Sequence, residues 1–332
     1  MITLALPAGN SVATRFSGAR HRLFAFSGLI ALIAIFSLLS PNFLQTGNII
    51  TILQATSVNG VLAIAATLVI ISGGIDLSVG TLMTFCSVIA GVLLTNLELP
   101  LAVGVPGALI GGAICGAFSG TLIAKLKIPP FITTLGTMLI YKGLSLAICG
   151  AKPIYFTSVP AFAKISTGSL ISGLIPGLPI PNGVLILFLV GMAAAFILAR
   201  TALGRFIFAL GSNEEALRLS GVNTERWKIA VYTLAGGVCG VAGILIASRI
   251  NSAQPAIGQG YELDAIAAVV IGGTSLSGGR GTMLGTMIGA LIISVVANGL
   301  RILSVEQEWQ IVVTGAIIIL AVYIDILRRK SA

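Results

Sequence analysis

Charged residues are absent from long stretches of this chain, and these stretches limit what it can fold into. Segments without a single Asp, Glu, Lys or Arg include 23–71, 77–97, 99–124, 165–199 and 281–300. Charged residues make up 9% of the 332 residues and hydrophobic residues 56%, whereas a soluble domain carries about 25% charged residues. A helix needs about 20 apolar residues to cross a bilayer. The sequence therefore predicts a polytopic membrane protein.

Hydropathy and loop signals predict the fold class and the number of spans. The fold class is all-α, a transmembrane helix bundle of about ten spans. The eighth span is short and interrupted by glycine. Alternating segments of about ten residues, which mark a membrane β-barrel, are not found in the sequence. The expected spans lie near 23–39, 49–71, 79–95, 101–124, 131–149, 183–199, 228–247, 262–276, 282–300 and 310–326.

The positions of basic residues predict the orientation of these spans. Cytoplasmic loops of membrane proteins are enriched in Lys and Arg. Ten spans with a cytoplasmic N-terminus place most of the 19 Lys and Arg residues inside. Only Lys152, Lys164, Arg249 and Arg301 then fall outside, while Lys142 lies within a span. Both termini are therefore expected in the cytoplasm.

This topology divides the chain into a membrane domain and two short ends. Residues 1–22 form a cytoplasmic N-terminal segment, 23–326 the transmembrane domain and 327–332 a cytoplasmic tail. Within the domain, 200–228 is the longest cytoplasmic loop, and 150–182 is an outer loop rich in Gly and Pro. Basic residues that flank spans on one side explain the net charge of +9, so no nucleic-acid partner is expected.

The sequence lacks the histidines and the phosphate-loop lysine that common catalytic, metal and nucleotide sites require. His21 is the only histidine, so neither a histidine-based zinc site nor a Ser-His-Asp triad can be built. The four cysteines fall in apolar spans, where free cysteine acts as a small hydrophobe. Gly273 and Gly278 have the spacing of a phosphate loop, but the loop lysine does not follow. We expect no catalytic residue, metal or cofactor on this chain, so any ATP must bind another polypeptide.

Many of the 41 glycines lie four residues apart within the expected spans. Glycine at this spacing removes side chains from one helix face and lets another backbone approach closely. The pattern favours tight packing inside one subunit, with a dimer seam or a path lined by small residues as alternatives. The glycines are Gly107, Gly111, Gly112, Gly116 and Gly120, then Gly236 and Gly240, and finally Gly281, Gly285 and Gly289.

The 200–228 loop contains a sequence that predicts a short helix near 213–220. Ser212 and Glu215 have the capping-box spacing, in which the serine caps the helix. Glu214 and Glu215 lie in the first turn, where the helix dipole favours anions, and Gly221 supplies a left-handed stop. Such a short helix is unstable alone in water. It must pack on the protein's own spans or in a groove of a cytoplasmic partner.

A second glycine-rich loop, 72–80, contains Asp76 beside Gly73 and Gly74. An acid at membrane depth is costly and indicates a functional site, but Asp76 precedes the third span and could instead cap that helix. Glu262 and Asp264, at the start of the eighth span, leave the same two interpretations open. Broken glycine-rich helices also recur at the binding sites of transporters.

Several motifs in order resemble one family over about 40–330. The chain resembles the membrane permease subunit of bacterial ABC sugar importers of the ribose permease type. Its residues 212–221 match the E-A-A…G pattern of ABC importers in part, because Leu217 replaces the second alanine and no Leu-Pro follows. The motifs are Ser40-Pro41-Asn42-Phe43, the Gly73–Gly80 loop, Ile128–Met138, Thr201–Arg205, Ala209–Ala216 and Gly260–Gly279.

The resemblance implies a multi-pass protein of the bacterial inner membrane that works with partners. These are cytoplasmic ATPase subunits that hold ATP and Mg, a periplasmic sugar-binding protein and a second permease copy or paralogue. Alternating access would carry a neutral monosaccharide along a path lined by residues such as Asn59, Thr133 and Thr134. The coupling element to the ATPase would be formed by Ser212, Asn213, Glu214, Glu215, Ala216 and Gly221.

Other functions are compatible with parts of the sequence. A permease of the same superfamily could carry branched-chain amino acids, nucleosides or a furanosyl signalling molecule. An ion-coupled symporter would need acids embedded in the membrane, and all ten acids lie at or beyond the expected span ends. An intramembrane enzyme would need a histidine cluster or an acid pair within a span, and the chain has neither.

Overall fold

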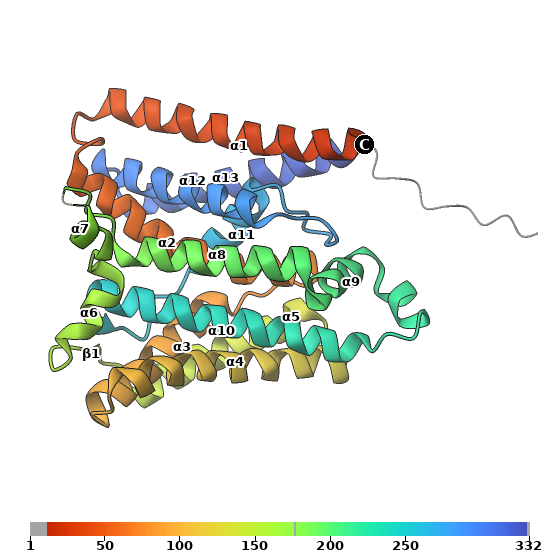
Figure 1. The fold of residues 1–332 in the computed structure, drawn as a ribbon, viewed down its shortest axis with the longest axis horizontal. Helices are drawn as coiled ribbons and strands as arrows, with labels where there is room; N and C mark the ends of the chain where they lie inside the picture. Colours follow the sequence, from red (N-terminus) through yellow and green to blue (C-terminus); the bar gives the residue numbers. More distant parts are fainter. Residues whose placement is uncertain (1–11, 176, 331–332) are drawn as a thin grey trace, which may run out of the picture.

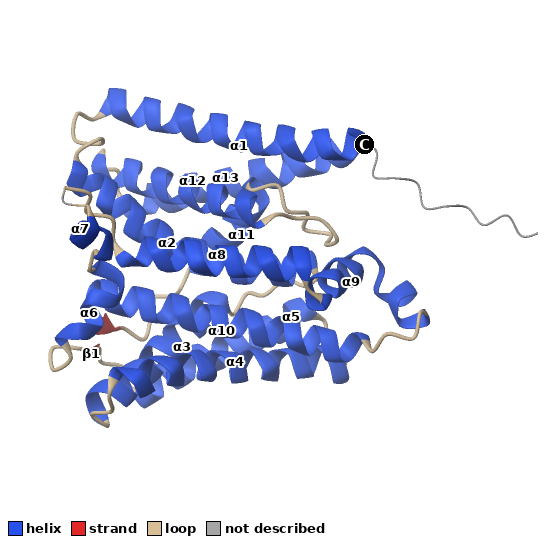
Figure 2. Ribbon diagram, viewed as in Figure 1, coloured by secondary structure: helices blue, strands red, loops and turns tan. Residues whose placement is uncertain are grey.

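Helices form nearly all of the protein (Figure 2). The structure, a computed structural model, describes all residues except 1–11, 176 and 331–332. In chain order the elements are α1 (Val12–Leu39), α2 (Thr46–Ile71), α3 (Val79–Gly91), the π-helical turn η1 (Val92–Asn96), α4 (Leu101–Lys125), α5 (Pro130–Ile148), β1 (Ile154–Tyr155), α6 (Pro160–Thr167), α7 (Leu170–Leu174), α8 (Asn182–Arg200), α9 (Ala202–Leu219), α10 (Thr224–Ile250), β2 (Ser252–Ala253), α11 (Tyr261–Ile271), α12 (Met283–Ile302) and α13 (Gln307–Lys330).

The long helices run side by side, and the short elements lie at the two ends of the bundle (Figure 1). The α9 helix lies at one end, together with the start of α1 and the C-terminal end of α13. The α6 and α7 helices and β1, which pairs antiparallel with β2, lie at the opposite end. The two described ends of the chain therefore share the end occupied by α9. Which end faces the cytoplasm stays a prediction.

Every expected span contains a helix, and seven of these helices are long and apolar enough to cross a membrane. They are α2, α3 with η1, α4, α5, α8, α10 and α12. The apolar parts of α1 (Ala25–Leu39) and α13 (Gln307–Leu320) are shorter. At 1.5 Å per residue, the 11 residues of α11 rise about 16 Å, half of a hydrocarbon core of about 30 Å. The expected eighth span is thus a half-length helix, and the count of ten stays a prediction.

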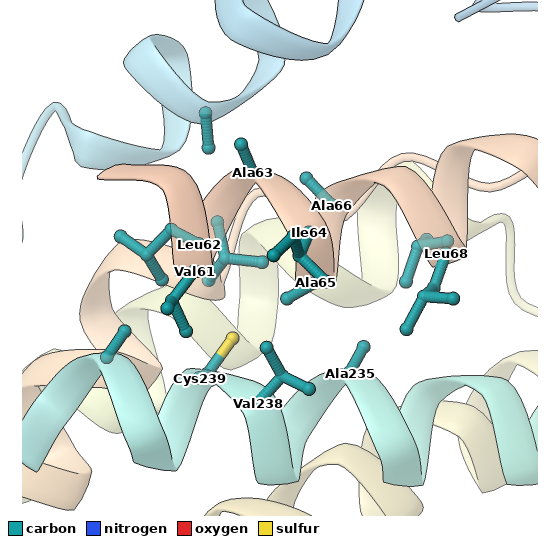
Figure 3. Close-up of a cluster of buried hydrophobic side chains, with 14 of the residues drawn as sticks. Val61, Leu62, Ala63, Ile64, Ala65, Ala66, Leu68, Ala235, Val238 and Cys239 are labelled. Carbon is teal, nitrogen blue, oxygen red and sulfur yellow. The ribbon is translucent and has the colours of Figure 1, made fainter. Parts of the chain in front are cut away.

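Helix α2 carries apolar residues on all of its faces, and it therefore lies at the centre of the bundle. Every residue from Thr56 to Ile71 is buried, as expected for a helix that is hydrophobic all round. Figure 3 shows Val61, Ala65 and Leu68 pointing toward α10, which carries Ala235, Val238 and Cys239, whereas Ala63 and Ala66 point to the opposite side. By contrast, α4, α5 and α8 are largely exposed and present large apolar side chains. These helices form the surface suited to lipid.

Glycines bring the backbones of α4 and α10 into direct contact. An added Cβ on Gly116 would collide with the Tyr232 carbonyl oxygen, and one on Gly236 would collide with the Gly112 carbonyl. Close approach of this kind is the reason for glycine at these positions. The glycines of α12 likewise meet carbonyl oxygens of the α11 segment, Gly289 at Ala268. The prediction of tight packing inside one subunit is confirmed for these glycines.

Candidate functional site: a polar cavity beside two helix breaks

A cavity of about 800 Å³ lies among α2, α10, α11, α12 and α13. Its walls are rich in amide and hydroxyl side chains, although they belong to otherwise apolar helices. The space is far larger than one water molecule needs. Its lining residues include Thr51, Asn59, Arg249, Gln259, Tyr261, Asp264, Ser294, Asn298, Arg301, Gln307, Gln310 and Thr314.

Three buried polar residues form the part of the cavity wall deepest in the bundle. Asn59 on α2 donates through Nδ2 to Ser294 Oγ on α12 at 3.3 Å. One turn along α12, Asn298 donates to Asn48 Oδ1 at 2.9 Å. The Oδ1 atom of Asn298 is buried without a hydrogen-bond partner in the described part of the chain. Buried polar groups are normally paired, so this wall has hydrogen-bonding capacity to offer a solute.

The cavity also carries one acid and two bases. Asp264 lies in the first turn of α11, and Arg249 and Arg301 lie in the last turns of α10 and α12. None of the three forms an ion pair within the residues that the structure describes. Together these three residues carry a net charge of +1. The amide and hydroxyl side chains that line the cavity outnumber them.

Two non-helical stretches lie inside the bundle, and the second of them borders this cavity. The first, 72–78, follows α2 and runs along α10, where Gly74 packs against the Tyr232 hydroxyl. The second, 254–260, precedes α11. The second stretch touches the first turn of α3, just after the first stretch ends: a Cβ on Gly80 or Gly258 would collide with the other's carbonyl oxygen. Irregular backbone at membrane depth is tolerated where it is buried in protein or lines a cavity. The second stretch belongs to the candidate site, because Gln259 and Gly260 line the cavity.

Asp76 lies buried in the first of these stretches. Its Oδ1 accepts the Ser78 N–H at 2.8 Å and the Ser78 hydroxyl at 2.6 Å. Ser78 itself is the N-cap residue of α3. Asp76 therefore does not cap α3 directly, as one interpretation of the sequence predicted, but fixes the residue that precedes the helix. Gly73, at φ +87°, makes the turn that leads into this stretch possible.

The candidate residues Thr133 and Thr134 are buried but do not line the cavity. They lie in the first turn of α5. Thr134 Oγ1 donates to the Ile75 carbonyl at 3.2 Å and so holds the Asp76 stretch in place. The structure brings Thr134 to the helix break rather than to the predicted solute path. Asn59, by contrast, lines the cavity as expected.

Glu262 and Asp264 lie in the same first turn but face different surroundings. Both Glu262 carboxylate oxygens accept the Gly260 N–H at 3.1 Å, so Glu262 stabilises the start of α11 beside Gly80. Only Asp264 lines the cavity. Sequence reasoning missed Ser294 and Asn298, although their spacing of four residues on one apolar helix is a signal that could have identified them.

The predicted coupling segment is the second half of α9. This helix runs from Ala202 to Leu219 but is interrupted at Asn213, whose backbone is extended at φ −162° and ψ 97°. The expected left-handed stop is confirmed, because Gly221 has φ +83° and its N–H donates to the Arg218 carbonyl at 3.0 Å. Leu219 is 80% exposed, so the end of this segment presents an apolar side chain to its surroundings.

The prediction that Ser212 caps this helix is wrong. Asn213 is the cap, because its Oδ1 accepts the Ala216 N–H at 2.9 Å. The extended backbone at Asn213 shifts the helix start by one residue, so the capping-box spacing no longer applies. The Glu215 carboxylate lies 3.8 Å from the Arg218 guanidinium instead of reaching back to a cap amide. The Glu214 carboxylate forms an ion pair with Lys228 Nζ of α10 at 2.6 Å.

Seven helices of spanning length within the described residues define a polytopic membrane protein, and comparison with known proteins identifies its family. A family model described as "Branched-chain amino acid transport system / permease component" matches residues 48–322. The ribose import permease protein RbsC of Escherichia coli K12 is 44% identical over 300 residues, 90% of this chain and 91% of the relative. RbsC of Bacillus subtilis is 42% identical over 322 residues, 96% of each chain.

The fructose import permease protein FrcC of Rhizobium meliloti is 38% identical over 304 residues, 92% of this chain and 84% of the relative. No solved structure gives a significant match. The chain belongs to this family of permeases and is a multi-pass protein of the bacterial inner membrane.

Proposed function

We propose that the chain is the membrane permease subunit of an ATP-driven importer that carries a monosaccharide, a ribose-like pentose or a hexose. The observation that carries this proposal is the amide- and hydroxyl-rich cavity, whose neutral hydrogen-bonding groups suit the hydroxyls of a sugar. Relatives named for ribose and fructose import support the same substrate class. The helix break beside the cavity, at 254–260, is typical of transporter binding sites.

The importer needs partners, because this chain carries no complete phosphate-loop motif. A cytoplasmic ATPase binds ATP and Mg, a periplasmic binding protein delivers the sugar, and a second permease copy or paralogue completes the membrane unit. Residues 212–221 dock on the ATPase. The exposure of Leu219 supports docking, because a helix in a partner's groove is a recurring recognition mode.

Uptake of radiolabelled ribose by the reconstituted transporter tests the proposal. Asn59→Leu replaces a cavity amide by an apolar group of similar size, and we expect at least a tenfold loss of uptake with the ATPase still bound. Gln54→Leu, on the same helix but outside the cavity lining, is the matched control and should transport normally. Equal uptake by both variants would contradict the assignment of the cavity.

A branched-chain amino acid is the second candidate substrate, because Asp264, Arg249 and Arg301 offer charges of both signs to a zwitterion. Competition with unlabelled leucine separates the two candidates: it leaves ribose uptake unchanged if the substrate is a sugar. Uptake that persists without ATP but stops when the proton gradient collapses would instead indicate an ion-coupled symporter.

A further inference from the structure

Four glycines from three separate segments meet at the α9 end of the bundle. Gly73 follows α2, Gly211 lies in α9 immediately before the kink, and Gly278 and Gly279 lie between α11 and α12. The Gly279 N–H donates to the Ile71 carbonyl at the end of α2 at 2.9 Å. We call this cluster of Gly73, Gly211, Gly278 and Gly279 the glycine joint.

The segments of the glycine joint touch through their backbones. An added Cβ on Gly211 would collide with the Ile71 carbonyl oxygen and lie 2.6 Å from the Gly279 nitrogen. A Cβ on Gly278 would lie 2.9 Å from Gly211 Cα. Backbone atoms cannot rotate away as flexible side chains can. A displacement of α9 at this point must therefore move the end of α2 and the α11–α12 loop with it.

The helices held at the glycine joint are three of the cavity walls. Asn59 is on α2, Asp264 on α11 and Ser294 on α12. Around the joint, α9 is also tied to α10, by stacking of Phe206 on Trp227 with ring centroids 4.3 Å apart and by the Glu214–Lys228 pair. The fifth wall, α13, has no residue in the joint.

We propose that the glycine joint positions the cavity walls according to the position of α9, so that movement of the coupling segment changes the width of the cavity between α2 and α13. Gly211 is the central positioning residue, because it touches both other segments. This inference rests on the proposed function, in which an ATPase docks on residues 212–221.

A distance measurement across the cavity tests the inference without using the transported solute. Spin labels on Thr51→Cys (α2) and Gln307→Cys (α13) report the width, in a background with the partly exposed Cys115 and Cys149 changed to serine. The complex with its ATPase is measured by pulsed electron resonance without nucleotide and with ATP and vanadate. We expect the label distance in this parent protein to shift when ATP binds.

The same measurement is made on two glycine variants of the labelled protein. Gly211→Ala should abolish the ATP-dependent shift while the ATPase remains bound and still binds ATP. Gly136→Ala, on an exposed face of α5 where a Cβ meets no atom within 4 Å, is the matched control and should shift as the parent does. A normal shift in Gly211→Ala would overturn the inference.

Gly279→Ala keeps the test decisive if Gly211→Ala does not fold. Its Cβ would lie 3.2 Å from Ser212 Cα, a milder contact than at Gly211, and alanine at φ +70° adds backbone strain at the joint. We expect the shift to fall at least twofold. A full shift in this variant would also overturn the role of the joint. A parent protein that imports ribose without any ATP-dependent shift would overturn the inference and leave the proposed function intact. A parent protein that does not import ribose would contradict the proposed function, and so the two failures are separated.

Discussion

The Asn213 cap provides a quantitative test of the structure against the sequence pattern. Asn213→Ala removes the hydrogen bond from the Ala216 N–H to Oδ1, which is 2.9 Å long. Loss of an N-cap side chain costs about 1 kcal/mol. The segment after the kink, 214–219, is less than two turns long, so its own helix propensity does not compensate. About 1 kcal/mol corresponds to about a fivefold larger population of the locally unfolded segment.

Hydrogen exchange of the amides at 216–220 in the detergent-solubilised protein measures this population. We expect exchange to be about fivefold faster in Asn213→Ala and binding of the ATPase to be weaker by a similar factor. Ser212→Ala is the matched control, because Ser212 is the cap predicted from sequence but accepts no capping hydrogen bond here. Faster exchange in Ser212→Ala with no change in Asn213→Ala would refute the reasoning.

Three further predictions concern the helix break, the glycine contacts and the topology. Asp76→Asn retains an oxygen for the Ser78 N–H, so it should fold normally but import more slowly, whereas normal uptake would leave Asp76 a purely structural role. Gly116→Ala should lower stability by about 1–3 kcal/mol and reduce the melting temperature, and an unchanged temperature would contradict the close contact of α4 and α10. In intact cells, an impermeant thiol reagent should label Lys152→Cys but not Asn213→Cys, and the reverse result would invert the topology.

The positions of the helices were predictable from sequence because each depends on a local property. Uncharged runs of about 20 residues coincide with the long helices, and Gly221 ends α9 as its freedom at positive φ predicts. The start of the segment after the kink was not predictable to one residue. Ser212 and Asn213 are both good capping residues. Which of them caps the helix depends on where the chain kinks, and the kink is at Asn213, two residues after the contact of Gly211 with Ile71.

The cavity was beyond local patterns because its walls combine α2 with four helices from the last third of the chain. Asn59 and Ser294 are 235 residues apart, and nothing near Asn59 indicates its partner. The non-helical stretch 72–78 likewise depends on tertiary packing, because its backbone is buried among neighbouring helices. Sequence reasoning identified Asp76 as unusual but could not show that it fixes Ser78.

The contact between α4 and α10 has a consequence for how the protein is made. About 100 residues separate the end of α4 at Lys125 from the start of α10 at Thr224. At 5–20 residues per second, a ribosome needs roughly 5–20 s to synthesise them. During that interval the glycine face of α4 is in the bilayer without its permanent neighbour. The order of translation therefore leaves this helix surface uncovered for seconds, and during that time the nascent chain is open to pairing with the wrong helix.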